Sequence, residues 1–239
     1  STNATGAAAK GGDWVLERNT GAIEAGLALS HAATAGYGEL LADPVATTSV
    51  TVDGASTSLI GSDITLKVAF DNTGGAVGYG PFVDLFIGHK GADGSTTNLN
   101  LHDGLNFKSA SYFGTPVEST LYTLTNGAPA AGQLQIVGGN ITHPITGQLF
   151  AVPSGFAAGD QLLVLTLPFG SFTPAQPAAA VDVVLTIDAK ADPGTALNLA
   201  SRGGYMFGKD PLNNPATDPV IYGAVVSSAL TPKAFDVET

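Results

Sequence analysis

The sequence predicts a mostly β protein built as an antiparallel sandwich, and three observations support that fold class. The large apolar side chains of residues 64–70 fall at every second position, as in a half-buried strand. The 31 glycines and 14 prolines suit short strands joined by tight turns. About ten such strands follow residue 47 at intervals of 8–15 residues, with no amphipathic segment of helical length between them. This pattern disfavours a doubly wound α/β fold.

Each expected strand is an apolar or alternating run bounded by turn residues. Val50 and Val52 alternate with polar neighbours before the turn Asp53–Gly54, and the run 82–87 ends at Gly88. The run 162–167 is apolar apart from Thr166 and is followed by Pro, Gly and Ser, so Gly170–Ser171 is expected to be a turn. The remaining expected strands are 105–113, 119–125, 133–137, 148–152, 161–167, 180–188, 196–202 and 220–230.

Residues 1–43 follow a different pattern from residues 44–239, so a boundary is expected between them. The segments 13–18 and 22–25 flank Asn19-Thr-Gly21, which predicts a hairpin. Apolar residues of 27–41 then recur at near-helical spacing and predict a short helix. Asp43–Pro44 ends that segment, because proline disfavours a helical residue before it. The prediction is a hairpin and helix appended to the sandwich.

Composition excludes several classes of function. The formal net charge is −11 with only nine Lys and Arg, so no basic stripe is available for nucleic acid. Without cysteine there can be no disulfide and no thiolate metal site. No apolar run reaches the length of a membrane span, and no signal-peptide pattern opens the chain, which we expect to be a fragment of a longer protein.

Residues 47–232 resemble a module of very large bacterial cell-surface proteins, of the repetitive adhesin or isopeptide-forming fimbrial type. The similarity is carried by the stretches Phe70–Thr73, Gly78–Leu85, Gly159–Pro174 and Asp210–Pro219. The resemblance implies an Ig-like sandwich with a spacing or adhesive role on the bacterial surface, without catalysis. It also implies an extracellular location and neighbouring modules as partners.

Residues 1–43 resemble the C-terminal end of a caspase-like leader domain found in some of these proteins. The similarity is carried by Ser1–Gly6, Gly11–Glu17 and Thr20–Ala25. The leader's His and Cys would lie upstream, so its activity cannot reside in this chain. A hairpin separated from its own sheet needs another edge, which makes strand donation to a copy of the chain an alternative function. Trp14 and Ile23 would then carry the contacts.

A carbohydrate-binding module is a second alternative, with a glycan on a host or biofilm surface as the partner. The aromatic residues of the strands are better explained by core packing. Phe169 and Phe172 flank the expected Gly–Ser turn, where we expect them to project and to contact a ligand or neighbour.

Asp84 lies inside the apolar run 82–87, where a carboxylate must be paired, liganded or solvent-facing. One interpretation is a calcium site with Asp71 or Asn72, because calcium prefers oxygen ligands. The others are an outward-facing side chain, or one that accepts hydrogen bonds from the backbone of residues 78–80. Asp93–Gly94 fits a hairpin turn better than a calcium loop.

No catalytic pattern is evident. His31, His89, His102 and His143 share no metal-binding spacing and are expected on the surface or in loops, and Gly-x-Ser-x-Gly is absent. Lys67 is the candidate for an isopeptide bond, which needs a strand lysine, an asparagine and a buried acid. Lys67 is out of phase with the apolar positions and is expected to face solvent, so no crosslink is expected.

Overall fold

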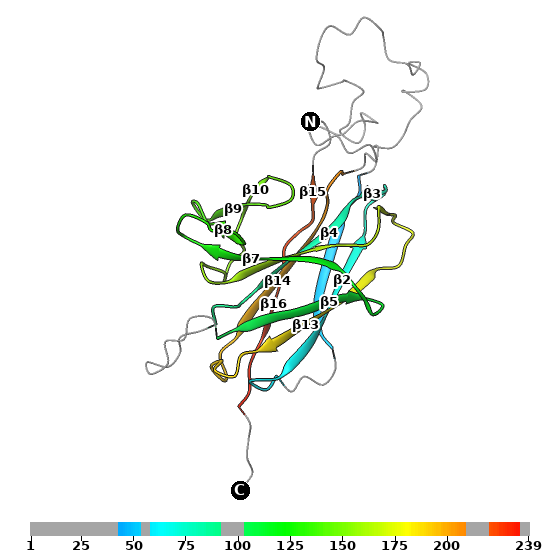
Figure 1. Ribbon diagram of the computed structural model, residues 1–239. Coiled ribbons are helices and arrows are strands. Elements are labelled where there is room, and N and C mark those ends of the chain that lie inside the picture. Colours follow the sequence, from blue (N-terminus) through cyan, green and yellow to red (C-terminus); the bar gives the residue numbers. More distant parts are fainter. Residues whose placement is uncertain (1–42, 54–57, 92–102, 209–219, 235–239) are drawn as a thin grey trace, which may run out of the picture. The chain divides into compact units, whose positions relative to one another are not determined.

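The computed structural model describes residues 43–53, 58–91, 103–208 and 220–234, and every regular element within these ranges is a strand (Figure 1). The prediction of a mostly β, antiparallel sandwich is confirmed. The hairpin and helix expected within residues 1–43 lie outside the described residues. The strands are β1 (Ala46–Val52), β2 (Asp63–Asn72), β3 (Gly78–Tyr79), β4 (Pro81–Ile87), β5 (Leu105–Tyr112), β6 (Thr115–Pro116), β7 (Glu118–Thr125), β8 (Gln133–Gln135), β9 (Asn140–Thr142), β10 (Leu149–Ala151), β11 (Gln161–Thr166), β12 (Ser171–Phe172), β13 (Ala179–Ile187), β14 (Leu197–Tyr205), β15 (Ile221–Tyr222) and β16 (Val226–Leu230).

One layer of the sandwich is a five-stranded sheet in the order β1-β2-β13-β5-β6. Its strands alternate between buried and half-exposed residues, most regularly in β2 and β13. This alternation arises because one face of the sheet packs on the core and the other meets solvent. The alternation expected for residues 64–70 is therefore confirmed.

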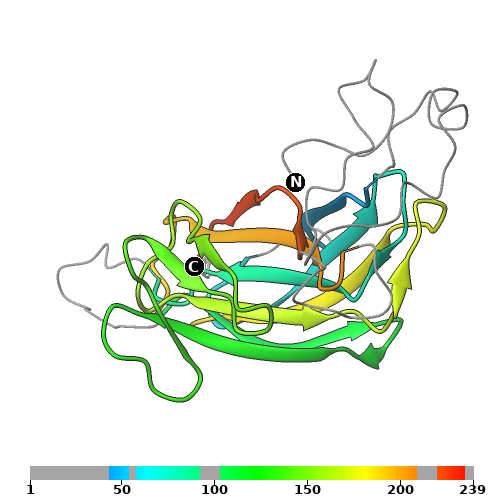
Figure 2. The same ribbon diagram turned by 90° about the horizontal axis from the view of Figure 1, so that it is seen from above.

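The other layer is a seven-stranded sheet in the order β15-β14-β4-β11-β7-β8, with β16 also paired to β14 (Figures 1 and 2). All seven residues of β4 are buried, as are five of the six in β11. Such continuous burial requires cover on both faces of the sheet, and β4 and β11 are central strands.

Two apolar cores provide that cover. The main core fills the space between the sheets and contains Phe70, Leu85, Leu163 and Tyr205. A smaller outer core lies on the opposite face of the seven-stranded sheet and contains Phe86, Ile141, Phe150, Leu162 and Val164. Its cover comes from residues 126–157, which leave β7, form β8, β9 and β10, and return to β11 (Figure 1).

Several short elements depart from the expectations. The segment expected as one strand, 220–230, is divided into β15 and β16 around Gly223, where a side chain would collide with the carbonyl of Ala46. The expected turn at Gly170–Ser171 is only partly a turn, because Ser171 begins β12, which pairs with β3. The short strand β9 was not expected.

The chain enters and leaves the sandwich at opposite ends of β2. Val45 lies beside the end of β2, where its amide donates to Oδ1 of Asn72 at 3.1 Å. Lys233 lies beside the residues that lead into β2, where its backbone forms hydrogen bonds with the backbone of Ser58 and Ile60. The ten residues of β2 span about 30 Å between these two points.

Candidate functional site

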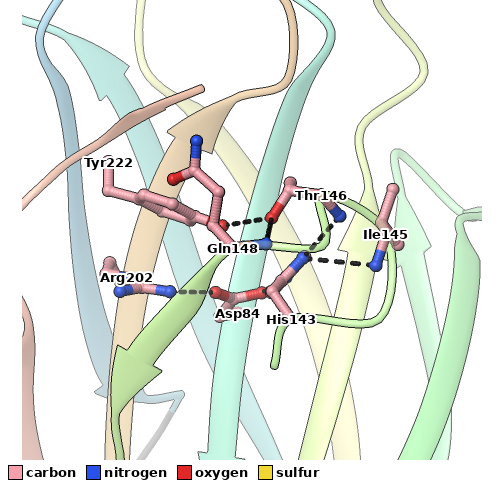
Figure 3. Close-up of polar contacts among 7 residues, drawn as sticks. All are labelled: Asp84, His143, Ile145, Thr146, Gln148, Arg202 and Tyr222. Atoms are coloured by element: carbon pink, nitrogen blue, oxygen red, sulfur yellow. Dashed lines mark hydrogen bonds and ion pairs between the residues drawn. The ribbon is translucent and has the colours of Figure 1, made fainter. Parts of the chain in front are cut away.

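A buried cluster of charged and aromatic side chains lies on the outer face of the seven-stranded sheet, and Asp84 is at its centre (Figure 3). Asp84 is 0% exposed in the middle of β4, between Val164 of β11 and Arg202 of β14. Both carboxylate oxygens are hydrogen bonded, to Arg202 and to His143. The sequence predicts that Asp84 is paired, liganded or solvent-facing, and in the structure Asp84 is paired with Arg202. The expectations of an outward side chain or of bonds to residues 78–80 are wrong, because residues 126–157 cover this face of the sheet.

Arg202 supplies the opposite charge from the adjacent strand. Its Nη2 donates to Oδ2 of Asp84 at 2.9 Å, and its guanidinium carbon lies 4.0 Å from the ring centres of Phe150 and Tyr222. A guanidinium held between two aromatic faces is well suited to burial, because it is weakly hydrated and attracted by the ring electrons. Gly204 makes room nearby, since a side chain there would overlap the ring of Phe82.

His143 connects residues 126–157, the segment that covers this face of the sheet, to the cluster by a hydrogen bond. It follows β9 in the turn that leads to β10, and its side chain is fully buried. Its Nε2 lies 2.9 Å from Oδ1 of Asp84, and its Nδ1 accepts hydrogen bonds from the backbone N–H groups of Ile145 and Thr146. Because Nδ1 accepts, the proton is on Nε2, and the neutral ring donates to Asp84. The loop position was expected, but the burial and the bond to Asp84 were not.

Tyr222 closes the cluster toward β15. Its hydroxyl lies 2.6 Å from Oγ1 of Thr146, which ties the β9–β10 turn to the edge of the sheet (Figure 3). Burial raises the pKa of the Tyr222 hydroxyl above its usual value, so the phenol is neutral at physiological pH. The Thr146 hydroxyl is therefore engaged with a neutral partner rather than with a base.

The arrangement suits stabilisation rather than chemistry. One carboxylate balances one guanidinium, and the histidine uses both ring nitrogens in hydrogen bonds. Nε of Arg202 is a buried atom that has no hydrogen-bond partner among the described residues, but a guanidinium nitrogen has no basic lone pair for proton transfer. The cluster holds residues 126–157 onto the sheet.

The residues considered for calcium take separate roles. The Asn72 side chain bonds to backbone groups of Val45, Gly74, Ala76 and Phe172. Asp71 accepts the amide of Asn72, while Asp84 belongs to the buried cluster. Within the described ranges, no three His, Asp or Glu side chains are grouped closely enough to hold a metal ion. Calcium binding by Asp71, Asn72 and Asp84 stays a prediction.

Lys67 faces solvent, as expected from its position in β2. Its side chain is 41% exposed and its Nζ lies 2.6 Å from Oδ1 of Asp182 on β13 and 3.6 Å from Oδ2 of Asp53. The hydrogen bond that Lys67 donates to the Asp182 carboxylate raises the pKa of the Lys67 ammonium, so the amine stays protonated. An isopeptide bond needs the neutral amine as nucleophile.

The expectation that Phe169 and Phe172 project from a turn is wrong. Phe172 is 1% exposed and packs edge-on against Phe70, and Phe169 is half-buried between Phe172 and Tyr112. The pairing of β12 with β3 turns both rings inward. Within the described ranges, an aromatic residue that does project is Phe113, which is 88% exposed at the tip of the β5–β6 hairpin.

Several other expected site residues lie outside the described residues: Trp14, Ile23, His31, Asp93 and His102. His89 is half-buried, and its Nδ1 lies 3.1 Å from the carbonyl of Leu105.

Sequence reasoning missed Arg202 and His143. For Arg202 a signal existed, because it sits among the apolar and small residues of 196–205 as Asp84 does within 82–87. Two opposite charges in two apolar strands predict a buried pair if the strands are adjacent. For His143, the sequence offers no comparable signal.

Comparison with known families gives one match. Residues 1–41 match the family described as Domain of unknown function (DUF4347), which covers less than half of the chain and lies outside the described residues. No curated protein matches the sequence at a significant level. The caspase-like character expected for the first 43 residues stays a prediction.

Among solved structures, the chain is similar to a cohesin module of a family 33 glycoside hydrolase from Clostridium perfringens, with 8% identity, a TM-score of 0.41 and coverage of 80% of this chain and 100% of that chain. It is also similar to a C-terminal fragment of the major pilin GBS80 of Streptococcus agalactiae, with 12% identity, a TM-score of 0.35 and coverage of 79% and 56%. A third is AvmM, which catalyses macrocyclization in alchivemycin A biosynthesis, with 11% identity, a TM-score of 0.39 and coverage of 80% and 91%. Because these TM-scores lie below 0.5, the fold rests on the strand topology described above.

The described part of the chain contains no helix long and apolar enough to span a membrane.

Proposed function

We propose that residues 44–239 form a structural and adhesive module of an exported bacterial surface protein, without a catalytic role. The observation that carries this proposal is the sealed Asp84–Arg202–His143 cluster. A buried ion pair costs free energy to desolvate, and the bonds of Asp84 to Arg202 and His143 fix one arrangement of the strands and the segment around it.

The geometry of the two chain ends supports the same proposal. The chain enters beside Asn72 and leaves beside Ile60, about 30 Å apart along β2. A module joined at opposite ends lengthens a string of modules by nearly its full height. The resemblance to repetitive surface proteins noted from the sequence implies such a string.

Surface location is tested with antibodies raised against the purified 239-residue chain. We expect the antibodies to label intact cells that produce the parent protein, and brief treatment of those cells with an external protease to remove the label. Labelling that appears only after the cells are permeabilised would contradict the proposal. A cytosolic protein probed in parallel controls for cell integrity.

A glycan-binding function has one observation in its favour, the projecting ring of Phe113 beside Tyr112, whose ring centre is 4.4 Å away. An exposed aromatic face stacks on the apolar face of a sugar. A glycan array probed with the chain and with Phe113→Ser tests this alternative. Hits that are the same for both proteins would exclude Phe113 as the contact.

A further inference from the structure

The open edges of the two sheets differ in how they are protected. On β5, β6 pairs with Ser111 and Tyr112, a bulge interrupts the pairing with β13 beside Lys108, and Lys108 forms an ion pair with Asp63. At the other side, β1 packs beside β14 and β16. Lysines, bulges and covering segments are the devices by which proteins prevent strands from pairing between molecules.

Among the residues that the structure describes, none of these devices protects the first half of β7. β7 pairs with β11 from Glu118 to Thr123, but on its outer side only residues 123–125 have a partner, which is β8. Among the described residues, no strand pairs with the outer side of 118–122. This stretch, Glu-Ser-Thr-Leu-Tyr, contains no lysine and no proline, and its first three residues are exposed.

The backbone groups on this open edge can be assigned from the neighbouring hydrogen bonds. Leu124 bonds toward the β11 side, through Asp160 and Gly159, whereas Thr123 and Thr125 bond toward β8, through Gly132 and Ile136. Outward and inward groups alternate along a strand. The N–H and C=O groups of Ser119 and Leu121 therefore point outward.

This edge is complementary to itself. When two copies of 118–122 pair in antiparallel fashion about Thr120, Ser119 of each copy meets Leu121 of the other, and each meeting forms a hydrogen-bonded pair. The result is about four N–H···O bonds between the copies, with a close non-hydrogen-bonded pair of threonines on the two-fold axis. No outward backbone group of the stretch is left without a partner.

The side chains fit the same register. Leu121 packs toward the main core and Tyr122 toward the outer core, so Glu118, Thr120 and Tyr122 share the outer face. Glu118 then stands opposite Tyr122 of the other copy, which keeps the two carboxylates apart. The chain before Glu118 turns toward the other sheet, because the amide of Val117 bonds to the carbonyl of Ala110 on β5, so we expect the pairing between the copies to end at Glu118.

From the free edge and its self-complementary register, we propose that two copies of this chain pair through β7, antiparallel and centred on Thr120, so that their seven-stranded sheets become one continuous sheet. This inference goes beyond the proposed function and does not depend on where the protein is located. It differs from strand donation by the first residues of the chain, since the paired strands are both β7.

A single cysteine tests the register directly, because the natural chain has none. Thr120→Cys places two thiols opposite each other in a non-hydrogen-bonded pair, whose Cα separation suits a disulfide. The matched control is Glu118→Cys. Residue 118 is also exposed and lies on the same face as residue 120, but in this register it stands about four residues from residue 118 of the other copy. Under mild oxidation we expect Thr120→Cys to form covalent dimers at least tenfold faster than Glu118→Cys.

Equal rates for the two cysteine variants, or no dimer from a folded Thr120→Cys protein, would overturn the proposal. A second measurement needs no cysteine. We expect light scattering to detect a rise in mass with concentration for the natural chain, and a natural chain that stays monomeric at every concentration would overturn the proposal. Thr120→Lys places two ammonium groups on the axis, and we expect this change to remove the rise. Retention of that rise in a Thr120→Lys protein with the natural circular dichroism spectrum would also overturn it.

Discussion

The two sheets of the sandwich carry their charged residues in opposite ways. In the five-stranded sheet, Lys67 and Asp182 pair on the solvent face, where water competes for both. In the seven-stranded sheet, Asp84 and Arg202 pair beneath residues 126–157, and aromatic rings replace water around them. An ion pair on a face open to solvent adds little to stability, whereas each partner of a buried pair is required, since a buried charge without its partner is costly.

The largest effect is expected from Arg202→Leu, which leaves the Asp84 carboxylate buried without a counter-charge. We expect a loss of about 3–5 kcal/mol in the free energy of unfolding, measured by chemical denaturation. The matched change in the other sheet, Lys67→Met, is expected to leave the denaturation midpoint nearly unchanged. A double variant, Asp84→Leu with Arg202→Leu, should recover much of the loss, because no lone charge remains. Equal midpoints for Arg202→Leu and Lys67→Met would contradict the comparison.

A smaller effect is expected from His143→Ala, which removes one donor to Asp84 and the acceptor of two backbone N–H groups. We expect a loss of about 2 kcal/mol. The loss should be local, so hydrogen exchange should quicken in β9 and β10 while β2 and β13 stay protected. Uniformly faster exchange in both sheets would show that His143 does more than fasten the covering segment.

A gain of stability is expected at the tip of the β5–β6 hairpin. Phe113 has a φ of 49°, a left-handed conformation that asparagine adopts more readily than phenylalanine. Phe113→Asn is therefore expected to stabilise the protein by about 0.5–1 kcal/mol, measured as a rise in the denaturation midpoint. Phe172→Ala is the contrasting control, with an expected loss of about 3 kcal/mol from the core. A loss from both variants would mean that the exposed ring contributes to the fold.

The smallest effects concern the pH dependence of stability. The contributions of one carboxyl group in each sheet should change with pH in opposite directions. At the start of β11, burial raises the pKa of the Asp160 carboxyl, so its contribution to stability is present below the unfolded value and lost as pH rises through the folded value. In β2, the hydrogen bond from Lys108 lowers the pKa of the Asp63 carboxyl, so its contribution is present above the unfolded value and lost as pH falls through the folded value.

Asp160→Asn should therefore gain stability relative to the natural protein as pH rises through the acidic range, and Asp63→Asn should lose it. Denaturation midpoints measured at several pH values between 3 and 7 give both differences. Two differences of the same sign would contradict these assignments.

The five-stranded sheet was the easier one to predict from the sequence. A face in solvent imposes a period of two on β2, and its neighbour β13 was found within one residue of its start and end. In the seven-stranded sheet, cover on both faces removes the period, so β4 and β11 appeared only as apolar runs. The short strands β3, β6, β9 and β12 were missed because none of them lies in an alternating or apolar run long enough to indicate a strand.

The candidate site could be predicted only in part. A carboxylate inside an apolar run indicates that Asp84 must be satisfied, but the satisfying residues depend on which strands become neighbours. Arg202 is 118 residues away and His143 is 59 residues away in sequence. The burial of the Phe172 ring likewise depends on the pairing of β12 with β3, and no local sequence pattern predicts this pairing.

The placement of the two chain ends has a mechanical consequence. A pull on residues 44 and 234 acts at opposite ends of β2, so the load runs along the strands rather than across them. The seven pairs that join β1 to β2 and the five that join β16 to β14 must then slide together instead of opening one at a time. A sandwich loaded in shear resists extension until many hydrogen bonds break at once.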